Sequence, residues 1–263
     1  MNSTIAILVQ ADLRSLTRAR WLLAAAGLGA VVLLGLGLTS DGTELQRNAA
    51  GVFSLGGLAL ALGIGAPALV RDLERGTFAL SASAGASLTD LGWSRLISRS
   101  IGVLGVLGIW ALAAQIGAAL GGRADEALLI HMLLTALVFL MVMLAAAGAA
   151  TLMGVVAGGI FGIAVLISAQ AIVNVKAADD QGLLGSGGEL VQAAYWFLPR
   201  MLISPMIASL QRADEGGPVA PQFEINGNVA DIPSSGVDSV LWVIAWCGIF
   251  FGLSIVGLRR REL

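Results

Sequence analysis

The chain has 263 residues, of which 57% are hydrophobic and only 12% are charged, with a formal net charge of −2. Soluble domains carry about 25% charged residues, so these charges are too few to cover the surface of a globule of this length, which excludes an ordinary soluble protein. Glycine is frequent, at 35 residues, as is typical of membrane helices that approach one another closely. The composition predicts an all-α, polytopic membrane protein.

The first twenty residues predict a short amphipathic helix. Its apolar side chains share one helical face, whereas Arg14 and Arg18 lie on another. The apolar residues are Ile5, Val9, Leu13 and Leu16. We expect this helix to lie in the cytoplasmic membrane interface.

Six stretches are long enough to span a bilayer, which takes about 20 mostly apolar residues. The block 127–175 would measure about 73 Å as one helix, so it must fold back, most plausibly near Gly148–Gly154. The expected spans are 21–39, 49–70, 101–121, 127–148, 153–175 and 240–258. They form one membrane domain over residues 1–263.

The stretch 190–210 is apolar but carries Arg200 and two prolines near its middle. A central arginine costs about 2.5–3.5 kcal/mol on insertion scales, and proline removes a backbone donor. We therefore expect a broken helix at the outer interface, anchored by Tyr195 and Trp196, rather than a seventh span.

Charge predicts the orientation. With six spans, segments 1–20, 71–100 and 259–263 share one side and hold ten of the 15 basic residues but five of the 17 acidic ones. Positive charge marks the cytoplasmic side, so both termini and residues 71–100 are expected there. Residues 176–239 are then extracytoplasmic, either as a solvated connector or as a docking site for an extracytoplasmic partner.

The polar segment 71–100 contains local helix signals. Ser87 followed by Asp90 fits a capping box, and Leu88 and Leu91 then recur at helical spacing. The segment predicts a short helix rigidly continuous with the third span. The alternative is an ordinary arginine-rich loop between two membrane helices.

A motif in this segment resembles the permease subunits of ABC exporters, specifically the ABC-2 membrane family. The matching residues are Glu74, Gly76, Thr77 and Arg95. The resemblance extends over nearly the whole chain, through the N-terminal helix, the six spans, the long outer segment and the basic C-terminal tail. The closest branch is that of the permeases for maturation of copper enzymes such as nitrous-oxide reductase. The chain departs from the family at Gly85 and Ala86, where a proline and a polar or basic residue usually stand.

The resemblance implies that 71–100 docks on a separate P-loop ATPase subunit, present in two copies, which carries ATP and Mg. Leu88, Leu91 and Trp93 would be the anchors of this coupling segment. It also implies a second permease subunit, as a homo- or heterodimer, and export across the plasma (inner) membrane of a prokaryote. Arg95 and Arg99 could instead act only as charges at the membrane surface.

The sequence offers no catalytic or metal site of its own. A P-loop needs a lysine in a glycine-rich loop, and the only lysine, Lys176, lies between Val175 and Ala177. One histidine, His131, and one cysteine, Cys247, give no cluster at metal-ligand spacing. We expect no cofactor on this chain, no nucleic-acid partner and no intramembrane protease, since no acid lies inside an expected span.

Few polar residues lie within the spans. Gln115 is in the third, whereas Gln170 and Asn174 share a face of the fifth. Since the resemblance places spans 2 and 5 beside the translocation path, these residues are pathway candidates. The alternative is an interhelical hydrogen bond without a transport role. For the whole chain, the alternative to a permease is a membrane anchor that recruits a maturation factor and moves no cargo.

Overall fold

The computed structural model describes residues 3–74, 87–124, 126–182, 187–208, 224–225, 228–229 and 233–260. The helices are α1 (Ser3–Thr17), α2 (Arg20–Thr39), α3 (Gly42–Gly65), α4 (Val70–Glu74), α6 (Leu88–Leu120), α7 (Glu126–Met153), α8 (Val155–Asp180), α9 (Gly188–Phe197) and α11 (Val237–Arg259). Two short antiparallel strands, β1 (Glu224–Ile225) and β2 (Asn228–Val229), pair beyond the bundle.

The all-α fold and the six expected spans are confirmed. Within the described residues, six helical segments are long and apolar enough to cross a membrane: α2, α3 with α4, α6, α7, α8 and α11. The stretch 190–210 contributes only the ten-residue α9. The chain is a multi-pass membrane protein.

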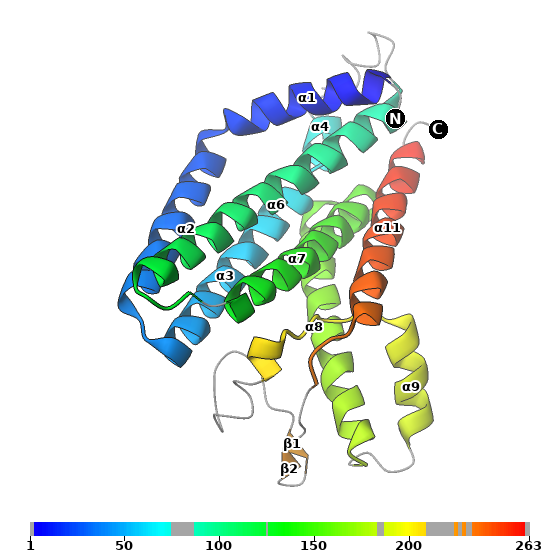
Figure 1. The fold of residues 1–263 in the computed structure, drawn as a ribbon. Coiled ribbons are helices and arrows are strands. Elements are labelled where there is room, and N and C mark those ends of the chain that lie inside the picture. The colour runs from blue at the N-terminus through cyan, green and yellow to red at the C-terminus, as the bar shows by residue number, and fades with distance from the viewer. Residues whose placement is uncertain are drawn as a thin grey trace.

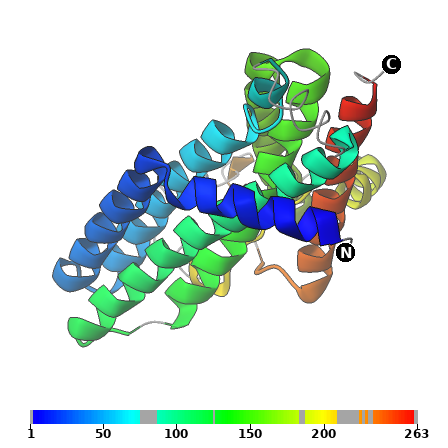
Figure 2. The same cartoon turned by 90° about the horizontal axis from the view of Figure 1, so that it is seen from above.

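Both chain termini lie at one end of the bundle, here named the terminal end (Figure 1). Helix α1 runs across this end (Figure 2) and packs its apolar face against α6, with Leu16 and Val9 buried. Arg14 and Arg18 are exposed, as the amphipathic pattern predicts. At the other end, named the opposite end, α9 lies beside α8 (Figure 1).

Helix α7 forms the centre of the bundle and packs against α3, α6, α8 and α11. All residues from 141 to 151 are buried. Glycines on the neighbouring helices allow this close packing: a Cβ at Gly57 would lie 2.4 Å from a ring carbon of Phe139, and one at Gly158 would lie 2.5 Å from the Cβ of Ala150. The small residues of α3 and α8 therefore serve to pack these helices against α7 of the same chain.

A single residue reverses the chain between α7 and α8. Gly154 has φ +96°, a conformation that glycine adopts without steric cost. Gly158 then faces Ala150 and Gly162 faces Ala146, so the two helices are antiparallel. The expected reversal near Gly148–Gly154 is confirmed, and Gly154 is the one residue between the two helices.

Trp110 of α6 joins three helices. A Cβ at Gly29 of α2 would lie 2.2 Å from its indole ring, and one at Gly56 of α3 would lie 2.8 Å from it. The indole N–H donates to the carbonyl oxygen of Ala26 at 3.1 Å. A large aromatic side chain thus fits where two helices carry glycine.

The second span differs from its expected bounds of 49–70. Helix α3 begins earlier, at Gly42, and ends at Gly65, before a turn that contains Pro67 and leads into α4. Proline has no backbone N–H, so it cannot continue the hydrogen-bond ladder of the helix. The break redirects the chain at the terminal end, where the candidate site lies.

Candidate functional site

The expected helix in the polar segment begins at Ser87. Its Oγ accepts a hydrogen bond from the Asp90 backbone N–H at 3.0 Å, and its hydroxyl donates to Asp90 Oδ2 at 2.7 Å. Helix α6 then continues without interruption to Leu120, a length of about 50 Å at 1.5 Å per residue. The prediction of a helix continuous with the third span is confirmed. Gly76 and Thr77 lie outside the described residues.

Arg95 of α6 contacts a carboxylate on each of two other elements. It forms an ion pair with Asp12 of α1, and its Nε lies 2.9 Å from Asp72 Oδ2 of α4. The Asp72 contact is an ion pair by distance but not by hydrogen-bond geometry, since Asp72 Oδ2 has no hydrogen-bond partner. All three side chains are at most 17% exposed. Arg95 is therefore a link between elements rather than a free surface charge.

Burial changes the pKa of Asp12, one of the two carboxylates paired with Arg95. Desolvation raises the pKa of the Asp12 carboxyl above 3.8, although the Arg95 and Arg99 guanidinium groups act to lower it. Asp12 is the one acidic residue among the first twenty, and this isolated charge is the feature of the sequence that points to it. Its partner, however, is 83 positions away, so local spacing did not reveal the pair.

The apolar residues of the coupling segment have different environments. Leu91 was expected to be a surface anchor, but it is only 4% exposed and belongs to the core of this chain. Trp93 is 40% exposed, and the centroid of its ring lies 4.5 Å from the ring centroid of Phe251 on α11. Leu88 is half-buried, and Glu74 is exposed at the end of α4. Of the described residues expected to form the docking surface, Glu74, Leu88 and Trp93 are therefore the ones that keep exposed area.

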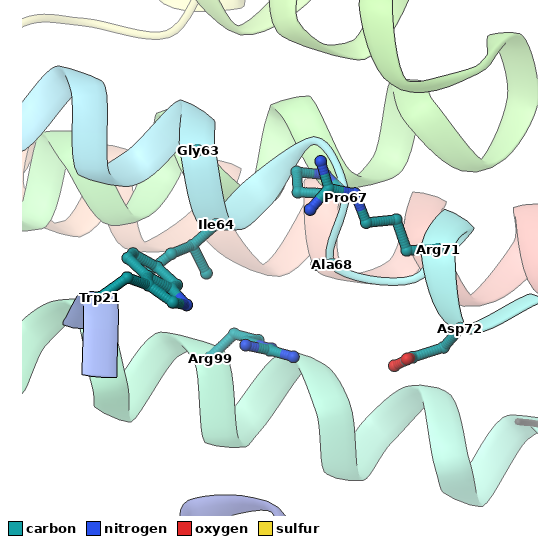
Figure 3. Close-up of a pocket in the computed structure, with 8 residues that line it drawn as sticks. All are labelled: Trp21, Gly63, Ile64, Pro67, Ala68, Arg71, Asp72 and Arg99. Atoms are coloured by element: carbon teal, nitrogen blue, oxygen red, sulfur yellow. The ribbon is translucent and has the colours of Figure 1, made fainter. Parts of the chain in front are cut away.

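A cavity of about 520 Å³ opens at the same end, between α2, α3, α4 and α6 (Figure 3). Residues that line it include Trp21, Ile64, Pro67, Arg71, Asp72 and Arg99. No local pattern in the sequence predicts this cavity, because it depends on the helix break at Pro67 and on the meeting of three segments distant in sequence.

The polar residues expected within the spans do not form one group. Gln170 Nε2 donates to Asn174 Oδ1 at 2.9 Å along α8, and Asn174 is 4% exposed. The hydrogen bond is thus within one helix, not between helices. Gln115 lies half-buried on α6, which forms no extended interface with α8 in the described part of the chain.

Arg200 is the largest fully buried side chain at the opposite end, at 1% exposure. Its guanidinium carbon lies 3.8 Å from the ring centre of Tyr195, 4.9 Å from that of Trp196 and 5.5 Å from that of Trp242. Its Nη1 lies 3.3 Å from Asp238 Oδ2. An aromatic cage and one carboxylate thus accommodate the charge.

The broken helix expected around Arg200 is confirmed. Helix α9 ends at Phe197, before Pro199, and an extended stretch leads to a short helical turn at residues 205–208. Trp196 is half exposed, consistent with an interfacial anchor, whereas Tyr195 packs on Arg200.

His131 connects α7 to this stretch. It is 5% exposed, and its Nδ1 lies 3.2 Å from Ser204 Oγ. Within the described ranges, no group of three histidine, cysteine or acidic side chains is placed to hold a metal ion.

The described residues form a membrane protein with six candidate spans and an ion-paired cluster at the end that carries both termini. No protein-family model matches the chain, and no curated protein is significantly similar to it.

Proposed function

We propose that this chain is the membrane-spanning permease subunit of an ABC-2 type ABC transporter, working as an exporter in the plasma membrane of a prokaryote. The observation that carries the proposal is the continuity of α6 from Leu88, in the coupling segment, to Leu120. A continuous helix moves as a rigid body, whereas a flexible loop would absorb a displacement. The excess of arginine at the terminal end favours a cytoplasmic location for it.

The ion pairs of Arg95 provide a route for the displacement. When two ATPase subunits close on ATP and Mg, they push on the exposed surface formed by Glu74, Leu88 and Trp93. Because Arg95 is paired with Asp12 and Asp72, α1 and α4 move with α6. Since α4 follows α3, the second span is reoriented as well.

The translocation path is proposed to lie beside α3 and α8, the second and fifth spans, where a second permease subunit meets this one. Apolar residues of α8 that the described part of the chain leaves exposed fit this placement: Val156 is 78% exposed, Ile160 64% and Ile167 63%. Gln170, which is half-buried, would line the path near the opposite end, and the buried Asn174 would hold it there through their hydrogen bond. The membrane-anchor alternative shares this surface but requires no motion of α6.

The proposal is tested by purifying the chain with its ATPase and measuring hydrolysis. Trp93→Asp places a charge on the proposed contact, and we expect ATPase stoichiometry and hydrolysis to fall. Trp196→Asp is the matched control, because Trp196 is a similarly exposed tryptophan at the opposite end. Thermal melting of both variants checks their folding.

Hydrolysis and stoichiometry that are the same in both variants would contradict the coupling assignment. A particle that holds no ATPase but a stable maturation factor would favour the membrane anchor.

A further inference from the structure

The cavity at the terminal end is lined by side chains from separate elements. Figure 3 shows Trp21 of α2 at one side, Asp72 of α4 at the other and Arg99 of α6 between them. The helical ladder is interrupted at Pro67, where a turn separates α3 from α4. Arg71, on the α4 side of this turn, lies at the rim of the cavity. At about 520 Å³, the cavity has room for a lipid headgroup.

The charge that is left without a partner in this cavity is positive. Among the described residues, neither Arg71 nor Arg99 forms an ion pair, and Arg99 Nε is buried without a hydrogen-bond partner. Asp72 also lines the cavity, and its Oδ2 lies 2.9 Å from Arg95 Nε without a hydrogen-bond partner. Counted with Arg95 and its partner Asp12, three arginines face two acids, which leaves one positive charge. Since a buried donor without a partner is costly, an acceptor from outside the chain would stabilise the site.

The position of the cavity indicates where that acceptor comes from. Trp21, which is 52% exposed, begins the first span, and tryptophan is enriched at the boundary between membrane and water. Two turns farther along the same face of the helix, Leu28 is 70% exposed and presents an apolar surface to acyl chains. A headgroup in the cavity could thus belong to a lipid whose tails lie along α2.

We propose that this cavity binds the phosphate group of an anionic membrane lipid. The guanidinium groups of Arg71 and Arg99 donate to the phosphate oxygens, as basic pockets between membrane helices do, and Trp21 covers the glycerol region. The bound lipid would bridge α2, α4 and α6 next to the Arg95 ion pairs. The proposal does not depend on an ATPase partner.

The test uses the full chain, delipidated in a neutral detergent and titrated with phosphatidylglycerol or phosphatidylcholine, with bound lipid counted by native mass spectrometry. We expect phosphatidylglycerol to bind more tightly than phosphatidylcholine. Arg71→Gln and Arg99→Gln should each weaken phosphatidylglycerol binding by about tenfold, the effect of losing one charged hydrogen bond. Arg14→Gln removes one exposed charge from the same end of the molecule and should bind like the wild type.

Two further variants and one soluble probe make the result decisive. Because Arg71 is exposed, Arg71→Gln should fold even if Arg99→Gln does not, and Arg99→Lys keeps the charge of Arg99 but loses its Nε donor. Equal affinity for the two lipids would overturn the assignment to an anionic lipid, and an equal loss in Arg14→Gln would overturn the site itself. If inorganic phosphate raises the melting temperature of the wild type but not of Arg71→Gln, and the lipids bind alike, the phosphate site is retained and its assignment to a lipid is wrong.

Discussion

The Nε atom of Arg95 lies 2.9 Å from the Oδ2 atom of Asp72, so the first turns of α6 are held to the segment that follows α3. The same guanidinium also pairs with Asp12 of α1. Three elements that are distant in sequence are thus joined through one side chain at the terminal end of the bundle.

Loss of this side chain should destabilise the terminal end. Arg95→Gln leaves two partly buried carboxylates without their cation, and we expect a loss of about 1–3 kcal/mol, between the values typical of exposed and of buried pairs. Thermal unfolding in detergent measures the effect. Arg14→Gln serves as the control because Arg14 is exposed on α1, and an equal effect of both changes would show that the ion pairs of Arg95 do not stabilise the fold.

The raised pKa of Asp12 predicts a pH dependence. A carboxyl whose pKa is higher in the folded state stabilises the fold at pH values below its unfolded pKa, and this contribution is lost as the pH rises through the folded pKa. The wild type should therefore lose stability relative to Asp12→Asn as the pH rises from below 3.8 towards neutrality. Melting temperatures of the wild type and Asp12→Asn, measured over this pH range, give the difference in stability. A difference that stays constant, or that grows in the wild type's favour as the pH rises, would contradict a raised pKa of Asp12.

The one-residue turn at Gly154 should tolerate no side chain. With φ +96° and ψ 167°, Gly154 has a conformation open essentially to glycine alone, so Gly154→Ala should cost on the order of 1–3 kcal/mol. Gly159→Ala is the matched control, since a Cβ at that helical position would meet no atom within 4 Å. Unfolding of both variants measures the contrast, and equal stabilities would exclude a strained turn.

The cage around Arg200 should require arginine. Arg200→Lys keeps the charge but loses the planar group that stacks on Tyr195 and reaches Asp238, so we expect a clear drop in melting temperature. Arg18→Lys, at an exposed position of the terminal end, should have little effect. A melting temperature unchanged by Arg200→Lys would mean that the stacking geometry contributes nothing to stability.

Features with a local signal were predictable from the sequence. The apolar runs predicted the six spans, and the Ser87 and Asp90 pair predicted the start of α6. The length of the block 127–175 required a reversal near Gly148–Gly154, which the structure places at Gly154. Each of these depends on residues close together in the chain. The break at Pro67 also had a local signal, but the span pattern concealed it because the flanking residues are apolar.

Features set by long-range packing were not predictable. Leu91 is buried because α6 presents that face to the rest of the bundle, and helical spacing cannot tell a face that packs inside from one that is free. The Arg95 and Asp12 pair and the cage of Arg200 likewise join residues from separate elements. Such contacts become visible only once the helices are placed.

The most direct test of the account is crosslinking from Glu74, which is exposed at the end of α4 next to the proposed docking surface. Cys247 is buried, so the thiol introduced by Glu74→Cys in intact membranes is the reactive one. We predict that a bifunctional crosslinker joins it to a protein that mass spectrometry identifies as a P-loop ATPase, and that Trp196→Cys at the opposite end yields no such product. Absence of an ATPase from the Glu74→Cys product, or its capture from Trp196→Cys instead, would contradict the account.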